Sequence, residues 1–297
     1  MSATAHAWDA AAEGWDRHSE LLGDWLREVT PAMLDAAGIV PGSRVLDIAA
    51  GAGDQTLAIA RRVGPGGHVL ATDISPRILA LAQDRLRASG FAHAATRIAD
   101  AQALGLVGAG FDAAVCRLGL MFCTAPLDAL REAHDALRPG GRFSAVVFAP
   151  PPGNPCIALM LAIARQHAGM VALTPTSAAA PGTLFSLGQP GLLAELLGRA
   201  GFVGVEVHAL SAPMRLPSSA HYVEFVRSAG MPIVQLLAAL PDALQRDAWD
   251  DMTAQLACFD TPSGWQGPNE LLLCAATRPH GDDIQATAGT RSNPGER

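Results

Sequence analysis

The chain has 297 residues, of which 49% are hydrophobic, enough for one large domain or for a core with a lid. Its formal net charge is −7, which argues against a nucleic-acid substrate. It contains no lysine, which excludes a Walker A phosphate loop, a pyridoxal Schiff base and the Tyr/Lys pair of short-chain dehydrogenases.

Five cysteines are present, and none forms a Cys-x-x-Cys pair, so we predict neither a metal site nor a disulfide framework. No apolar run approaches the ~18 residues that a membrane span needs, and the first ten residues lack the features of a signal peptide. We therefore expect a cytoplasmic protein without a membrane partner, and the sequence leaves its oligomeric state open.

The chain divides into a core with additions. Residues 1–43 are predicted to form a helical cover, rich in tryptophan (Trp8, Trp15, Trp25), over the open strand ends, and residues 44–150 form the core. Residues 151–200 read as a lid insertion with a helix, and residues 201–278 as two last strands with a helical insertion at 213–268. Residues 279–297 are predicted to be a disordered tail because they are polar and rich in Gly, Asp and Thr.

Apolar runs predict seven strands, and the helices between the first five favour right-handed crossovers and parallel pairing. The expected strands are residues 44–49, 68–73, 95–99, 111–118, 141–148, 202–210 and 270–277. The insertion at 213–268 is predicted to hold helices at 218–229, 231–239 and 241–259.

The most informative segment is the glycine turn that follows the first strand. Gly51 and Gly53 lie between that strand and a helix, where a backbone without side chains can approach a nucleoside cofactor. Thr56 stands where a dinucleotide fingerprint would have its third glycine, and Asp47 lies inside the strand. A carboxylate there repels phosphate and suits a cation, so the pattern departs from that of a dinucleotide site.

Two further acids follow predicted strands. Asp73 comes 20 residues after Gly53, a spacing at which an acid can accept both hydroxyls of a ribose. Ser75 before Pro76 predicts a helix start, which is compatible with ribose binding by Asp73. Asp100 ends the third strand and could accept from an adenine amino group, although a solvated loop acid is an alternative interpretation.

These segments, together with Phe111 to Phe122 and the Leu137-Arg-Pro-Gly-Gly turn, resemble a class I S-adenosylmethionine-dependent methyltransferase of the ubiquinone/menaquinone C-methyltransferase-like group. The resemblance covers residues 44–150. It implies an α/β, Rossmann-like doubly wound sheet of order 3-2-1-4-5-7-6 with the last strand antiparallel, and S-adenosyl-L-methionine as the cofactor. It places Asp47 near the methionine ammonium, Asp73 on the ribose and Asp100 at the adenine. The predicted cofactor-binding set is Asp47, Ala49, Gly51, Gly53, Asp73, Ile74, Asp100, Ala101 and Arg117.

Two residues carry more open hypotheses. Arg117 closes an apolar strand, so it either lines the cofactor or substrate pocket or forms a structural salt bridge. His18 lies in the segment that closes over the cofactor in the resembling family and is the candidate base, although a helix-surface histidine is the alternative.

The sequence thus predicts methyl transfer to a carbon or oxygen of a small, hydrophobic or aromatic metabolite. The alternatives are a protein of the same fold that binds the cofactor without methyl transfer, and a nucleotide-dependent oxidoreductase.

Overall fold

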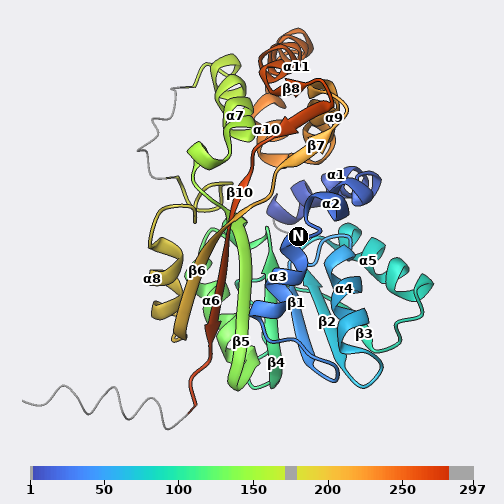
Figure 1. The fold of residues 1–297 in the computed structure, drawn as a ribbon, viewed down its shortest axis with the longest axis vertical. Helices are drawn as coiled ribbons and strands as arrows, with labels where there is room; N and C mark the ends of the chain where they lie inside the picture. The colour runs from blue at the N-terminus through green and yellow to red at the C-terminus, as the bar shows by residue number, and fades with distance from the viewer. Residues whose placement is uncertain (1–2, 171–178, 281–297) are drawn as a thin grey trace, which may run out of the picture.

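The computed structural model describes residues 3–170 and 179–280, and a seven-stranded sheet forms its core (Figure 1). The strands are β1 (Arg44–Ile48), β2 (His68–Asp73), β3 (Ala94–Ile98), β4 (Phe111–Arg117), β5 (Leu137–Phe148), β6 (Val203–Ser211) and β10 (Glu270–Thr277). Their order is β3-β2-β1-β4-β5-β10-β6. The strands β1 to β5 pair in parallel, and β10 is antiparallel to both of its neighbours. The predicted fold class and strand order are confirmed, because β10 is the seventh strand of the prediction.

The inner strands of the sheet are largely buried, whereas the edge strands β3 and β6 have no buried residue. In β1 every residue after Arg44 is buried, and β4 has five buried residues in seven. Runs of this kind are typical of parallel strands that are covered on both faces. The covering helices are α3 (Val29–Ala36), α4 (Asp54–Val63), α5 (Pro76–Ala88), α6 (Pro126–Ala136) and α8 (Leu192–Arg199).

Local signals set the helix starts beside the carboxyl ends of β1 and β2. The hydroxyl of Ser75 accepts from the amide of Ile78 at 3.1 Å and caps α5, with Pro76 at its first position, as predicted. Gly53 caps α4 with φ +88°, in the left-handed region that favours glycine. Both helices therefore begin next to the ends of their strands, where ligands bind in open α/β sheets.

A helical cap lies beyond the carboxyl ends of the strands (Figure 1). It contains α7 (Pro155–His167), α9 (Ser219–Ala229), α10 (Met231–Leu237) and α11 (Asp242–Leu256). A small sheet of order β7-β9-β8, which the sequence did not predict, joins β7 (Met214–Leu216), β9 (Gly264–Gly267) and β8 (Asp260–Thr261). These strands have two to four residues, too few for an alternating pattern to show.

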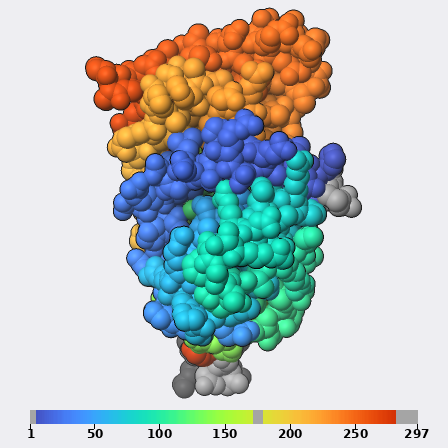
Figure 2. Space-filling view, turned by 90° about the vertical axis from the view of Figure 1, so that its right-hand side faces the viewer, coloured from blue at the N-terminus to red at the C-terminus, as the bar shows by residue number. Residues whose placement is uncertain are grey.

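The N-terminal helices separate the core from the cap. Helix α1 (Ala3–Arg17) packs on α5 of the core and on α9 of the cap, and α2 (Ser19–Trp25) follows it. In Figure 2 this N-terminal segment forms a blue band between the cyan and green core and the orange cap. The predicted tail from residue 281 onward, and residues 171–178 of the first insertion, lie outside the described residues.

None of the helices in the described ranges is both long and apolar enough to cross a membrane.

Candidate functional site

The carboxylate of Asp73 joins the end of β2 to the glycine turn after β1. Its Oδ2 accepts from the amide of Gly51 at 3.0 Å, and its Oδ1 accepts from the amide of Ser75 at 2.9 Å. The side chain is buried, and burial raises the pKa of Asp73 while these backbone donors oppose the rise. The acid predicted to hold a ribose therefore lies against the turn predicted to hold a nucleoside cofactor.

One cavity gathers most of the predicted cofactor-binding residues at the ends of β1 to β4. It has a volume of about 960 Å³, its open side included. Seven of the nine predicted residues line it: Ala49, Gly51, Asp73, Ile74, Asp100, Ala101 and Arg117. Ala49 takes φ +55°, a conformation that costs an L-residue ~1 to 3 kcal/mol and that clusters at functional sites.

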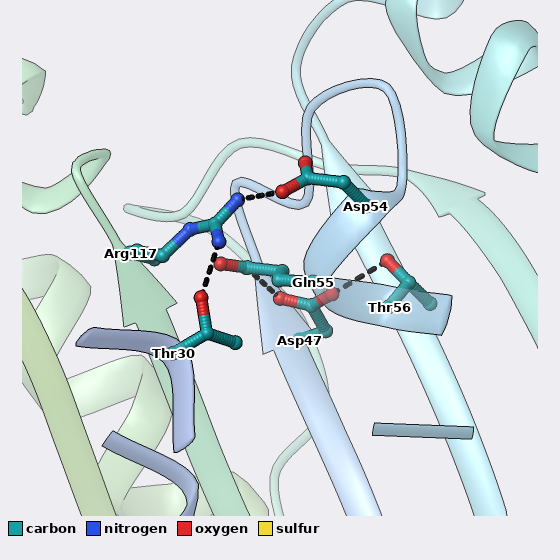
Figure 3. A network of polar contacts seen from close by, with 6 residues as sticks. All are labelled: Thr30, Asp47, Asp54, Gln55, Thr56 and Arg117. Carbon is teal, nitrogen blue, oxygen red and sulfur yellow. Dashed lines mark hydrogen bonds and ion pairs between the residues drawn. The ribbon is translucent and has the colours of Figure 1, made fainter. Parts of the chain in front are cut away.

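Asp47 is the first predicted residue that does not line this cavity. Its side chain is completely buried, Thr56 Oγ1 donates to its Oδ2 at 2.6 Å, and Gln55 Nε2 donates to its Oδ1 (Figure 3). Burial raises the pKa of Asp47 to about 7, against the opposing effect of these hydrogen bonds. Asp47 thus does not line the cavity itself; Gln55, which does, donates to its carboxylate, and the placement of Asp47 near a methionine ammonium stays a prediction.

Gly53 is the second exception, and its role is packing. A Cβ at this position would lie 2.8 Å from Ala82 Cβ and 2.9 Å from Ala82 Cα, so the start of α4 touches α5 there. Gly51, by contrast, has φ +59° and faces the cavity, and a Cβ on it would have no atom within 4 Å. Of the two glycines, Gly51 faces the cavity and Gly53 packs against α5, and the approach of a ligand to the turn stays a prediction.

Arg117 combines the two roles that the sequence left open. It lines the cavity, its guanidinium forms an ion pair with Asp54 at the start of α4, and its Nη1 donates to Thr30 Oγ1 at 2.6 Å (Figure 3). Only 8% of the side chain is exposed, so the carboxylate and the hydroxyl supply the partners that a buried guanidinium needs. This network also ties α3 to the cavity wall.

Several wall residues were not predicted as contacts. Trp8 and Trp15 of α1 line the cavity, in keeping with the expected N-terminal cover, although the sequence did not show which of its side chains would reach the ligand space. Gln102 lines it as well, donating to Asp100 and accepting from the amide of Ala125 at 2.6 Å. No motif marks Gln102 in the sequence, because its contact with the loop before α6, through the amide of Ala125, forms only in the folded chain.

A second cavity adjoins the first and is mostly apolar, with a volume of about 680 Å³, its mouth included. Trp8, Trp15, Leu118 and Phe122 line both cavities. The rest of its wall comes from α2, the cap and the strand ends and includes Trp25, Phe148, Met214, Tyr222, Phe225 and Ile233. Apolar side chains of both insertions thus contribute to the wall of this second cavity.

His18 lies between α1 and α2, outside the walls of both cavities. Its ring meets Phe225, which lines the apolar cavity, edge to face at 5.3 Å. Its Nε2 is buried and has no hydrogen-bond partner among the described residues. Burial, with the neighbouring charge of Arg17, lowers the pKa of His18.

Comparison with known proteins agrees with this geometry. Residues 45–141 match the family model described as "Methyltransferase domain". Over 156 residues the chain is 36% identical to the ubiquinone/menaquinone biosynthesis C-methyltransferase UbiE of Ectopseudomonas mendocina, a match that covers 52% of this chain and 60% of that protein. The match thus spans less than two thirds of the relative's length.

Solved structures share the fold at low sequence identity. Phosphoethanolamine N-methyltransferase 2 of Haemonchus contortus in complex with S-adenosyl-L-methionine has a TM-score of 0.54 at 18% identity, covering 85% of this chain and 53% of that one. The [4+2]-cyclase SpnF has a TM-score of 0.55 at 17% identity, covering 92% and 97%. Residues 45–141 are therefore similar to the methyltransferase domain of that family model, and about half of the chain is similar to ubiquinone/menaquinone C-methyltransferases.

Proposed function

We propose that the chain binds S-adenosyl-L-methionine in the first cavity and methylates a small apolar or aromatic molecule held in the second. The observation that carries this proposal is the shared wall: a cavity lined by acids and a glycine turn meets an apolar cavity across Trp8, Trp15, Leu118 and Phe122. A cofactor with a charged amino-acid end and a nucleoside fits the first cavity, and an apolar acceptor fits the second.

The polar groups of the first cavity suit this cofactor. Asp73 offers a carboxylate to ribose hydroxyls, and Asp100 lies at the next strand end, where an adenine would be reached. Gln55 Oε1 is buried without a hydrogen-bond partner among the described residues, while its Nε2 is held by Asp47. A methionine ammonium would satisfy this oxygen, with Asp47 behind it. The site therefore provides an unused acceptor where the cofactor would bring a donor.

The bound cofactor supplies an electrophilic methyl group on a sulfonium. Transfer breaks the bond between sulfur and the methyl carbon, forms a bond to the acceptor's carbon or oxygen, releases S-adenosylhomocysteine and frees a proton from the acceptor. The chain contributes alignment and the exclusion of water, which account for much of such catalysis. Similarity to a C-methyltransferase favours a carbon atom as the methyl acceptor, and methyl transfer to oxygen is the alternative that we propose.

The proton needs a base, and His18 remains our candidate. Burial lowers the pKa of His18, which favours the neutral imidazole that a base requires, but its ring lines neither cavity and lies against Phe225, so this role requires Phe225 to move aside. If His18 takes the proton, His18→Ala lowers the rate of transfer by ~10² to 10⁴ without weakening cofactor binding. A small effect on the rate would assign His18 to packing.

Isothermal titration with S-adenosylmethionine, S-adenosylhomocysteine and NADH tests the cofactor. We expect affinity near micromolar, ~8 kcal/mol, for the first two and none for NADH, whereas tight binding of NADH alone would reject the proposal. Methyl transfer is tested separately with S-adenosylmethionine labelled in the methyl group and a panel of phenols, hydroquinones and enols. Cofactor binding without label in any product would favour the alternative of the same fold with another activity, as in the cyclase neighbour.

A further inference from the structure

The amino end of α5 binds two carboxylates that come from different parts of the chain. Asp73, at the end of β2, accepts from the amide of Ser75 at 2.9 Å and lines the first cavity. Asp9, in α1, accepts from the hydroxyl of Ser75 and from the amide of Arg77, the latter at 3.1 Å. The first amides of a helix lack partners within the helix and attract negative charge. One serine at this helix start therefore connects the two acids.

Ser75 is completely buried, and its hydrogen bonds reach in three directions. Its amide donates to Asp73, its hydroxyl donates to Asp9, and the same hydroxyl accepts from the amide of Ile78 at 3.1 Å. The other oxygen of Asp73 accepts from the amide of Gly51 at 3.0 Å. A continuous series of hydrogen bonds thus runs from α1 through Ser75 to the carboxylate and the glycine turn of the first cavity. A fully paired buried network of this kind fixes the orientation of its members.

Asp9 differs from two other acids on the same face of α1. Glu13 and Asp16 follow it after four and seven residues, which places the three side chains on one side of the helix. Glu13 pairs with Arg77 and Asp16 with Arg85, so each meets a flexible guanidinium on α5. Both side chains of the Glu13 pair are more than half exposed, and such pairs contribute little to stability. Asp9, by contrast, bonds to the backbone of α5 and to a buried hydroxyl.

Asp9 does not itself line either cavity, but its neighbours in α1 lie against the cofactor cavity. Trp8 lines both cavities, and Ala12 packs with Ala52 of the glycine turn and with Ile78 of α5 in a small apolar cluster. The part of α1 that carries Asp9 is therefore seated on the turn and the helix start that border the first cavity. From this position Asp9 can affect a bound ligand only through other residues.

We propose that Asp9 is a positioning residue of the cofactor site: it holds Ser75, and Ser75 holds the carboxylate of Asp73 in the orientation that receives the ribose hydroxyls. The inference deepens the proposed function, on which it rests, because it adds a residue of α1 that sets cofactor affinity without touching the cofactor. A carboxylate that is fixed before binding loses little conformational freedom when the ligand arrives. Without Asp9 this ordering has to occur during binding, so the affinity falls.

The test measures binding of S-adenosylhomocysteine to the full chain by calorimetric titration. Asp9→Ala should weaken binding about fivefold, or ~1 kcal/mol, the usual contribution of a side chain that caps a helix. Ser75→Ala breaks the same connection from its other end and should weaken binding at least as much. Asp9→Asn keeps an oxygen that accepts from Ser75 and Arg77, so its affinity should stay within about twofold of the wild type. Glu13→Gln, the matched control on the same face of α1, should bind like the wild type.

A double-mutant cycle separates the positioning of Asp73 from a purely structural role of Asp9. If Asp9 acts through Asp73, Asp9→Ala costs no further affinity once Asp73→Asn has removed the charged acceptor, so the double variant binds like Asp73→Asn alone. If Asp9 only keeps α1 in place, the two losses of affinity add.

The inference is overturned if Asp9→Ala and Ser75→Ala bind like the wild type, if Asp9→Asn loses as much affinity as Asp9→Ala, or if the effects of Asp9→Ala and Asp73→Asn add. Failure of the proposed function looks different, because the wild type itself would then bind neither S-adenosylmethionine nor S-adenosylhomocysteine, and the inference would fall with it.

Discussion

Gly51 and Gly53 lie two residues apart in one turn, and the structure predicts opposite consequences for replacing them. Gly53→Ala puts a methyl group 2.8 to 2.9 Å from Ala82 at φ +88°. The left-handed backbone costs ~1 to 2 kcal/mol and the overlap with α5 a further ~1 to 3 kcal/mol, about 2 to 5 kcal/mol in all. At ~2 to 4 °C per kcal/mol, the melting temperature should fall by roughly 4 to 20 °C.

Gly51→Ala carries only the backbone cost, ~1 to 2 kcal/mol, because no atom lies within 4 Å of its Cβ position. Its methyl group enters the cofactor cavity instead, so we expect affinity for S-adenosylmethionine to fall at least tenfold, against less than about threefold for Gly53→Ala. Thermal melting followed by circular dichroism, and calorimetric titration at 15 °C, separate the two effects. Gly66→Ala, at an exposed turn with no positive φ and open space, is the control.

The reasoning would be refuted if Gly53→Ala melted like the control, or if Gly51→Ala bound the cofactor like the wild type. The first result would mean that α4 and α5 separate easily at Ala82. The second would mean that the cofactor does not approach the turn at Gly51, and the assignment of the first cavity would fail with it.

Three further predictions concern charged groups. Asp73→Asn should weaken S-adenosylmethionine binding tenfold or more in titration, since hydrogen bonds to a charged group contribute ~1.5 to 3 kcal/mol each; unchanged affinity would remove Asp73 from the site. In the wild type the folded-state pKa of Asp47, about 7, exceeds its ordinary 3.8, so its contribution to stability is full below pH 3.8 and is lost as pH rises to about 7. That loss is on the order of 4 kcal/mol at most, and Asp47→Asn should abolish it in urea unfolding measured at pH 5 and pH 7.5; equal pH dependence in both proteins would contradict the assignment. A double-mutant cycle of Arg117→Gln and Asp54→Asn should give a coupling energy of ~1 to 3 kcal/mol in the free energy of unfolding, and additive effects would show that the ion pair contributes nothing.

Sequence patterns were enough to predict the seven-stranded sheet and its order, and they predicted a site at the strand ends. Apolar runs marked the seven strands, of which β3 and β6 at the edges have no buried residue, the Ser75-Pro76 pair marked the start of α5, and the glycine turn with Asp73 predicted a nucleoside site at the strand ends. These signals are local, because an apolar run, a helix cap and a glycine turn each involve only a few consecutive residues.

The roles of individual residues could not be predicted in the same way, because they depend on neighbours in space that are distant in the sequence. Gly53 is a packing glycine because Ala82 touches it, and Asp47 is covered because Gln55 and Thr56 turn back onto it. Five residues of ordinary sequence context, Trp8, Trp15, Tyr222, Phe225 and Ile233, form one apolar wall only because α1 packs against the cap. The hydrogen-bond partner of a buried indole is likewise set by packing. The partner of Trp25 is 187 residues away, and Trp15 has none among the described residues. Hydrogen bonds between side chains and distant parts of the chain leave no periodic pattern in the sequence.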